Sequence, residues 1–379
     1  MKCERGRFGK VLIFGVIFTM LAFLSVSCTS ASVNSIQLTT STADDIHPSW
    51  SPDGTKILFS SNRSGNYDIW VMDSDGSNKV QLTSNSSYEA YYPVWNHAGN
   101  KIAFTRRYPL ELWRGGGYAD QLWIMNSDGS NQQKQNVNDT WRLISPTWSP
   151  DDTKIAFATR YLGNIYSYNI AAATTTDITP PVEEWPSGVI SRVSWGPTDR
   201  IAYDRWPVGI QTIDSSGGDY QVIVPEFEIG HPPVEPDWSP NGARFVLSLC
   251  GANMEKLDLA LAWNIPNSRE EVLENTASVD EWPSWNPANE SEIVFMSGGD
   301  YFFGSHDIWL MAIGPTPEEH DVLVTFDKGF LDVPLNILYD VVASVKNTGT
   351  VSDTFNLEIT NNPCGLSATI TPSDVTLSP

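Results

Sequence analysis

In this 379-residue sequence, glutamates and aromatic residues are the side chains that could together form a ligand-binding site. Aromatic rings provide flat apolar faces for sugars, and carboxylates beside them hold hydroxyl or cationic groups. The candidate set is Glu184, Glu235, Glu281, Tyr92, Trp113, Trp185, Trp282 and Tyr301. Such a set would suit stacking on a carbohydrate or holding a basic peptide, provided that the fold brings its members together.

Motifs for known catalytic and metal sites are missing from the sequence. It contains no GxSxG elbow, no Walker glycine loop, no HExxH and no CxxC. The DSDGSN run at Asp73 resembles a calcium loop, but it lacks the ligands at the fifth and twelfth positions, so it predicts a β-turn. The five histidines show no ligand spacing. We therefore expect no catalytic residue, no metal and no cofactor.

The charge of the chain limits its partners. It has 23 basic and 45 acidic side chains and a net charge of −22. Proteins that bind nucleic acids neutralise phosphates with Lys and Arg, so this balance argues against a nucleic-acid partner. It is compatible with cationic partners.

A repeat must position the candidate residues. Tryptophan recurs at 43- to 53-residue intervals, at Trp50, Trp95, Trp148, Trp195, Trp238 and Trp285. Most copies read P-x-W followed by S-P-D-G or a related turn, then a strand such as Ile57-x-Phe59. Further strands start at Asp68, Gln121, Asn164 and Asp307, and the fourth strand of the first copy ends at Thr83. Repeats of this length with four short strands are typical of propeller blades.

The repeat resembles the TolB-like propeller family, whose WD40-like PD40 repeat has this P-x-W-S-P-D-G core. The resemblance covers residues 35–315 and is weakest in repeats four and five. It implies an all-β fold, a six-bladed β-propeller of four-stranded antiparallel blades. The family's namesake carries a whole domain before its propeller, whereas only a short segment precedes the first blade here. The Tol–Pal role is therefore not carried over.

A short segment before the first blade echoes a blade's outer strand. Ile36-Gln37-Leu38-Thr39 is similar to Val80-Gln81-Leu82-Thr83. An extra outer strand at the N-terminus could pair with the last blade and remove an exposed edge. The alternative is an ordinary leading strand.

Residues 1–28 have the layout of a secretory signal. A basic start is followed by an apolar run at 11–24 and by small residues up to Cys28. The run is short for a membrane span. Lipidation of Cys28, which would anchor the protein to a membrane, and simple cleavage both stay open. Either way we expect an extracytoplasmic protein, in the periplasm or at the cell surface.

Residues 320–379 alternate apolar and polar positions and resemble an immunoglobulin-like, CARDB-type β-sandwich. A complete sandwich needs about 100 residues. We therefore expect a partial sandwich and a chain that is truncated or a fragment.

Propeller topology places the candidate binding face. The short SPDG and DSDG turns lie on one side of the disc, and the long, individual connections on the other side, where binding usually resides. The residue three positions before each repeat tryptophan should lie on that side of the central channel. These residues are His47, Tyr92, Ser145, Arg192, Glu235 and Trp282. Six different side chains indicate a channel mouth shaped for a ligand; the alternative is drift at exposed positions.

These patterns favour a non-catalytic binding or scaffold module for a protein or carbohydrate ligand at the cell envelope. One alternative is an enzyme, a polysaccharide lyase or glycoside hydrolase, which paired carboxylates or histidines from several blades on that face would favour. Another alternative is a purely structural surface protein.

Overall fold

The computed structural model describes most of the repeat region and four further strands. The described ranges are 34–84, 87–110, 117–138, 141–160, 163–180, 189–206, 208–225, 233–250, 257–266, 270–273, 279–298, 305–313, 322–326, 343–347, 353–356 and 374–377. The chain divides into two compact units, Val33–Ile313 and a second that comprises Met1–Ser32 and Gly314–Pro379. The predicted signal at 1–28, with Cys28, lies outside the described residues.

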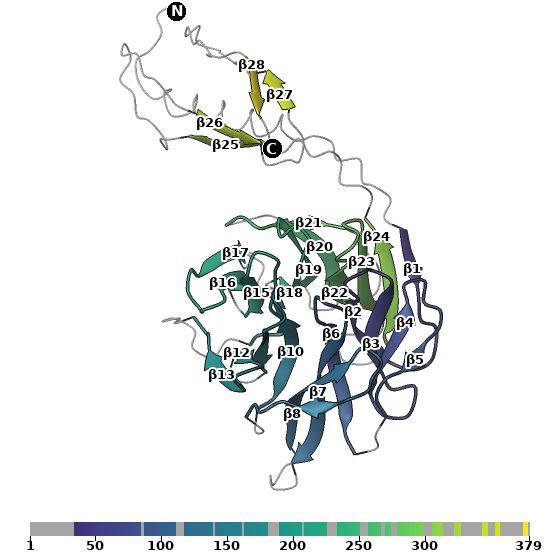
Figure 1. Cartoon of the computed structure of the whole chain (residues 1–379). Coiled ribbons are helices and arrows are strands. Elements are labelled where there is room, and N and C mark those ends of the chain that lie inside the picture. Colours follow the sequence, from purple (N-terminus) through teal and green to yellow (C-terminus); the bar gives the residue numbers. More distant parts are fainter. Residues whose placement is uncertain are drawn as a thin grey trace, which may run out of the picture. The chain divides into compact units, whose positions relative to one another are not determined.

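The first unit consists of six four-stranded antiparallel sheets arranged as the blades of a propeller, as the sequence predicts (Figure 1). The first three blades are β2 Asp45–Trp50, β3 Lys56–Ser61, β4 Asp68–Asp73, β5 Val80–Gln81; β6 Glu89–Trp95, β7 Lys101–Leu110, β8 Gly117–Asn126, β9 Gln133–Lys134; and β10 Leu143–Trp148, β11 Lys154–Thr159, β12 Ile165–Asn169, β13 Thr174–Asp177. The others are β14 Val193–Trp195, β15 Arg200–Arg205, β16 Gly209–Asp214, β17 Gln221–Pro225; β18 Val234–Trp238, β19 Arg244–Cys250, β20 Leu257–Trp263, β21 Glu270–Val272; and β22 Asp280–Trp285, β23 Glu292–Ser297, β24 Asp307–Ala312 with β1 Asn34–Gln37.

The SPDG turn forms because its side chains satisfy its own backbone. In the first blade, the Ser51 hydroxyl donates to Asp53 Oδ1 at 2.6 Å and accepts the Lys56 N–H at 2.9 Å. The same carboxylate accepts the Thr55 N–H at 3.1 Å. These hydrogen bonds lower the pKa of Asp53, and the one from Ser51 has the largest effect. The motif is therefore a structural turn.

The DSDG run is also a turn, as predicted. The Gly76 N–H donates to the Asp73 carbonyl at 2.9 Å, and Asp75 Oδ1 accepts the Ser77 N–H at 2.9 Å. Gly76 has a φ of 81°, and a Cβ there would meet the Leu38 carbonyl oxygen at 2.8 Å. Glycine is thus required because this turn packs against the outer strand of the neighbouring blade.

The N-terminal strand closes the ring, which confirms that prediction. β1 pairs antiparallel with β24, from Asn34 opposite Ala312 to Gln37 opposite Trp309, and the two lie side by side in Figure 1. Thr39 Oγ1 donates to Asp307 Oδ1 at 2.9 Å and accepts the Ile308 N–H at 2.9 Å. The last blade thereby obtains its fourth strand from the start of the unit, and the edge of β24 is covered.

Each repeat tryptophan packs between blades. All six are buried, with 3–9% of their surface exposed. Trp148 lies in a cluster with Ala103 and Leu122 of the blade before it, and Trp238 lies with Ala202 and Ile210 of the blade before it. The tryptophans therefore join each blade to its predecessor, as an array of units that cannot bury their own faces requires.

Five of the six innermost strands contain a bulge beside the tryptophan. The pairing register shifts there in β2, β6, β10, β18 and β22. The residue three before the tryptophan has a positive φ in these strands, at His47, Tyr92, Ser145, Glu235 and Trp282. The residue after each of them is proline, and the blade without a shift, β14, has Val193 in that place. A bulge re-aims a side chain, and such backbone strain is a pointer to function.

The second unit has two described antiparallel strand pairs. β25 Val322–Phe326 pairs with β26 Ala343–Asn347, and β27 Asp353–Asn356 pairs with β28 Asp374–Leu377. The immunoglobulin-like sandwich over 320–379 stays a prediction. Among the described residues, no helix has the length and apolar character that a membrane span needs.

Candidate functional site

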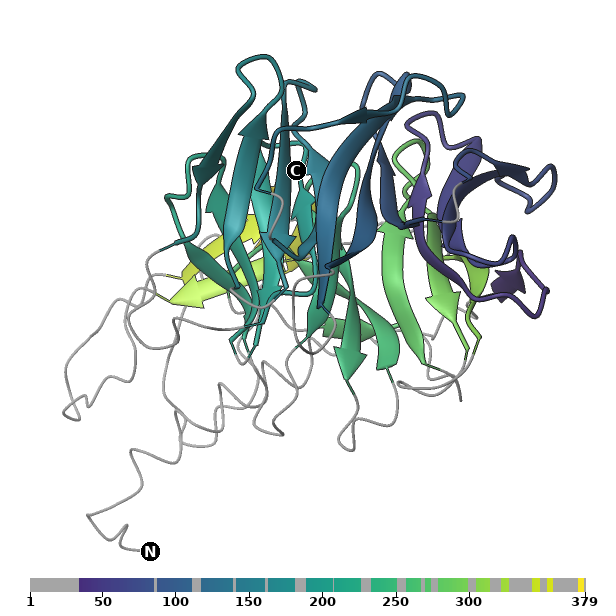
Figure 2. The ribbon, with the colours of Figure 1, turned by 90° about the horizontal axis from the view of Figure 1, so that it is seen from below.

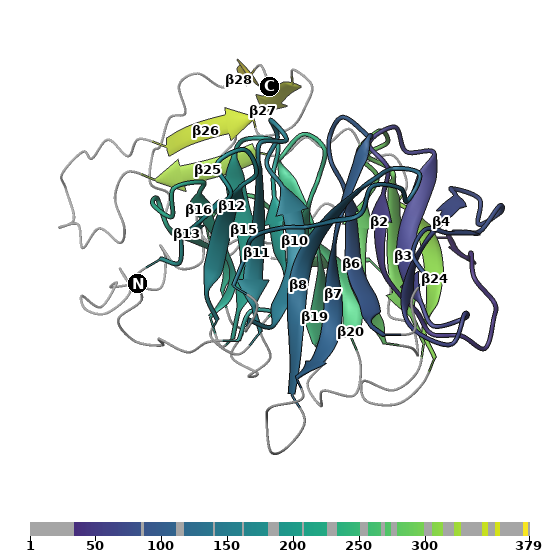
Figure 3. The ribbon, with the colours of Figure 1, turned by 60° about the horizontal axis from the view of Figure 1, so that its bottom comes forward.

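The central channel of the propeller holds two cavities at opposite ends. The strands run between two faces of the disc, so that turns and connections gather at either end (Figures 2 and 3). The turn-side cavity, about 400 Å³, is lined at its outer end by residues of the SPDG-type turns, such as Pro52 and Pro240. The loop-side cavity, about 550 Å³, is lined by residues of the long connections, such as Tyr67 and Val189. Ligand pockets typically measure about 300–1,000 Å³.

An aromatic group formed by His47, Tyr92 and Trp282 separates the two cavities and lines both. The ring centroid of His47 lies 4.0 Å from that of Tyr92 and 4.6 Å from that of Trp282, and the last two are 5.2 Å apart. All three are bulge residues with positive φ, so the bulges direct these side chains to the channel axis. Burial lowers the pKa of His47 well below its usual value, so its imidazole is neutral.

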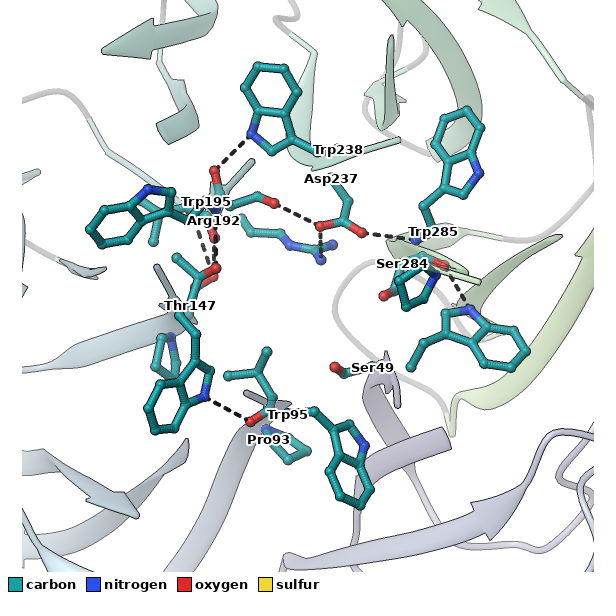
Figure 4. A pocket seen from close by; sticks show the side chains of 18 of the residues that line it. Ser49, Pro93, Trp95, Thr147, Arg192, Trp195, Asp237, Trp238, Ser284 and Trp285 are labelled. Carbon is teal, nitrogen blue, oxygen red and sulfur yellow. Dashed lines mark hydrogen bonds and ion pairs between the residues drawn. The ribbon is translucent and has the colours of Figure 1, made fainter. Parts of the chain in front are cut away.

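An ion pair lies at the wall of the turn-side cavity. Arg192 Nη2 lies 3.1 Å from Asp237 Oδ1, which also accepts the Ser194 hydroxyl at 2.8 Å. Asp237 Oδ2 accepts the Trp285 N–H at 2.9 Å. Figure 4 shows Arg192 and Asp237 together at the cavity, while the labelled indoles point away from its centre. Because these hydrogen bonds link three blades, this pair is chiefly structural.

Two glutamates line the loop-side cavity on neighbouring blades. Glu235 is buried, and its Oε2 accepts the Trp282 N–H at 2.9 Å and the Ser248 hydroxyl at 3.1 Å. Burial raises the pKa of both glutamates, and the charge of Glu235 raises the pKa of Glu281 further. Nearby Asp204, also buried, has its pKa raised to about 6 by desolvation. The charge of Arg192 acts in the opposite direction on Glu235, but burial outweighs it.

Two arginines line the same cavity from the opposite side. Arg107, within β7, donates from Nε to Asp120 Oδ1 at 2.8 Å, and its guanidinium lies 4.3 Å from the ring centroid of Tyr91. Asp120 Oδ2 accepts the Nε–H of Arg142 at 2.8 Å. Arg160 follows β11 and makes no ion pair with the residues that the structure describes. The carboxylate of Asp120 therefore fixes Arg107, whereas Arg160 is exposed.

The six predicted channel residues all line the channel. His47, Tyr92 and Trp282 contact both cavities, Ser145 and Arg192 the turn-side cavity, and Glu235 the loop-side cavity. They lie deeper than the predicted mouth, since Tyr92, Ser145, Arg192 and Glu235 are buried. None of the six is exposed, since His47 and Trp282 are half-buried. Glu281 joins them, and Trp113, Glu184, Trp185 and Tyr301 lie outside the described residues.

Sequence reasoning missed several residues of the cavities. Tyr67, Tyr91, Arg107 and Arg160 line the loop-side cavity, and Asp237 lines the turn-side cavity. Asp237 could have been found, because it directly precedes a repeat tryptophan and so must face the channel. The described residues contain no group of three or more His, Cys, Asp or Glu that could hold a metal.

Comparison with known proteins agrees with this architecture. Residues 27–112 match the family model of the TolB beta propeller domain. The chain is 33% identical over 124 residues to the TolB homolog of Chlorobaculum tepidum, a match that covers 33% of this chain and 26% of the relative. The chain spans only 21–38% of the length of the first curated relatives that it matches.

Solved structures share the fold at low identity. One from Agrobacterium tumefaciens, assigned to TolB, superposes with a TM-score of 0.52 and 14% identity, over 75% of this chain and 98% of that chain. An oligogalacturonate lyase from Vibrio parahaemolyticus superposes with a TM-score of 0.49 and 13% identity, over 76% and 95%. The likeness to the Agrobacterium tumefaciens structure shows the fold alone. The chain therefore carries a six-bladed β-propeller that is similar, over residues 27–112, to the TolB beta propeller domain.

Proposed function

We propose that this protein is a non-catalytic, extracytoplasmic binding module that holds part of a protein or carbohydrate ligand in the loop-side cavity of its propeller. The observation that carries the proposal is the composition of that cavity. Residues on or beside the innermost strands of all six blades meet there, and they combine aromatic rings with charged groups. Concave sites with a few convergent polar groups among apolar ones are the usual form of ligand sites.

The test uses the full chain and a panel of glycans and peptides, with binding measured by calorimetry. Replacing Trp282 with alanine should weaken binding at least about tenfold, because the indole forms the floor of the cavity and aromatic contacts dominate such sites. Tyr220→Ala, at a side chain that is 41% exposed and does not line either cavity, is the matched control. Equal binding by Trp282→Ala and wild type, with equal melting temperatures, would contradict the proposed site.

A glycoside hydrolase is a second candidate, since Glu235 and Glu281 supply the paired carboxylates that such an enzyme needs. Its chemistry requires one neutral and one ionised carboxylate, so that the two pKa values are pushed apart. Here burial raises the pKa of both. This favours binding over hydrolysis. Mass spectrometry of glycans incubated with the protein distinguishes the two functions. Glycan cleavage by wild type that is lost in Glu281→Gln would favour the hydrolase.

Anchoring is part of the proposal and depends on Cys28, which ends the predicted signal. If the thiol is lipidated, wild-type protein will be found in the membrane fraction and Cys28→Ser in the soluble extracytoplasmic fraction, because the lipid chain supplies the membrane affinity. Fractionation followed by immunoblotting measures this. Soluble wild-type protein outside the cytoplasm would refute anchoring while leaving secretion intact.

A further inference from the structure

The loop-side cavity has two arginines on one wall and two glutamates on the opposite wall. In a ring of six blades, the second blade faces the fifth and the third faces the sixth. Arg107 and Arg160 belong to the second and third blades, and Glu235 and Glu281 to the fifth and sixth. Each arginine therefore faces a glutamate across the channel. This arrangement suits a ligand with an anionic group at the arginine wall and a cationic group at the glutamate wall.

The arginines on one wall make no direct contact with the glutamates on the other. None of the ion pairs among the described residues joins these arginines to Glu235 or Glu281. Arg107 retains its two Nη groups while its Nε is bound to Asp120, and Glu281 makes no hydrogen bond within the described part of the chain. Arg107 is paired with Asp120 and Arg160 is exposed, so both arginines keep their charge, whereas burial favours the protonated form of the two glutamates. A ligand ammonium group beside these glutamates would lower their pKa and favour the carboxylates that pair with it.

The space between the charged walls is aromatic. Tyr67, Tyr91, Tyr92 and Trp282 line the cavity between the arginines and the glutamates, and the Trp282 N–H holds Glu235 in place. An aromatic face beside a carboxylate is a favourable place for an ammonium group. A guanidinium with free N–H groups is the usual partner of a carboxylate.

We propose that the cavity binds a small zwitterion, an amino acid or a short peptide with free ends, whose ammonium group meets Glu235 and Glu281 and whose carboxylate meets Arg107 and Arg160. This inference rests on the proposed function, because it names the ligand class of the same cavity. The volume of about 550 Å³ has room for a ligand of a few residues.

The test varies the ligand charges one at a time. The probes are the tripeptides Ala-Phe-Ala, Ala-Lys-Ala and Ala-Glu-Ala, each with free ends, N-acetylated, C-amidated or blocked at both ends; free phenylalanine and lysine represent the single amino acids. Calorimetry on the full chain should show binding of at least one free probe. Blocking either end of a bound peptide should weaken its binding at least about tenfold, because each block removes the ion pair between that end and the protein. Binding of free phenylalanine or free lysine would show that a single amino acid is a sufficient ligand.

Two variants assign the ends. Glu281→Gln should weaken binding of the free peptide and reduce the effect of acetylation, and Arg160→Gln should do the same for amidation; such coupling isolates each charge pair. These two positions are chosen because neither side chain hydrogen-bonds to another described residue, so the fold should persist, and melting curves will check it. If doubly blocked peptides bind as well as free ones, or if glycans bind and no free probe does, the zwitterion is wrong and the binding module stands. If neither peptides nor glycans bind, both proposals fail.

Discussion

Replacing Trp148 with alanine is expected to lower the free energy of unfolding by about 3–5 kcal/mol, as truncation of a buried tryptophan generally does. The side chain is 3% exposed and fills the space between the second and third blades. Domains are typically stable by about 5–15 kcal/mol, so a large share of the total would be lost. Urea unfolding measures the difference. A midpoint close to that of wild type would show that Trp148 is not part of the core.

A pair of phenylalanine variants separates packing from hydrogen bonding. Trp148 Nε1 donates to the Val94 carbonyl of the preceding blade at 3.3 Å, whereas Trp95 Nε1 is buried without a partner among the described residues. Trp148→Phe removes the indole hydrogen bond to the Val94 carbonyl, while Trp95→Phe removes an unpaired donor. The first variant should therefore lose about 1–3 kcal/mol more than the second. Equal losses would mean that the indole hydrogen bond contributes nothing to blade packing.

The sequence was sufficient to predict the blades because their signals are local and repeated. The turn at Ser51–Lys56 satisfies itself, and the tryptophan recurs in one register, so strand number, order and ring closure follow from periodicity and from the second copy of Gln-Leu-Thr at Gln37–Thr39. Even the exception is explained locally. Val193 replaces the proline in the single blade that lacks the bulge.

The cavity could be predicted only in part, because its composition depends on contacts between residues far apart in the sequence. The position three before each tryptophan gave the channel residues, but the bulges draw them inward from the mouth. Arg107 lies in β7 just beyond the length of a six-residue second strand such as β3, and it reaches the cavity because β7 and β8 extend further than the other strands (Figure 3). Asp120 then fixes it. Neither strand length nor that ion pair is encoded in the repeat.

The charge of Glu281 should appear in the pH dependence of stability. Burial raises its pKa, and the neighbouring Glu235 and Asp280 raise it further. A carboxyl with a raised pKa keeps its proton in the folded state at a pH where the unfolded chain, with an ordinary pKa of about 4.3, has released it. The folded state then binds more protons than the unfolded state, so this group's contribution to stability falls as pH rises between the two pKa values.

Glu281→Gln removes that penalty while keeping the shape of the side chain. Relative to wild type, the variant should therefore gain stability between about pH 5 and about pH 8, on the order of 1–2 kcal/mol, since one unit of pKa corresponds to about 1.4 kcal/mol. Urea unfolding of both proteins at the two pH values measures this gain. Glu290→Gln, on an exposed turn of the same blade, controls for the loss of one negative charge from this acidic chain. If both variants change equally with pH, Glu281 must be ionised in the folded protein throughout, and a positive group must then already lie beside it in the cavity.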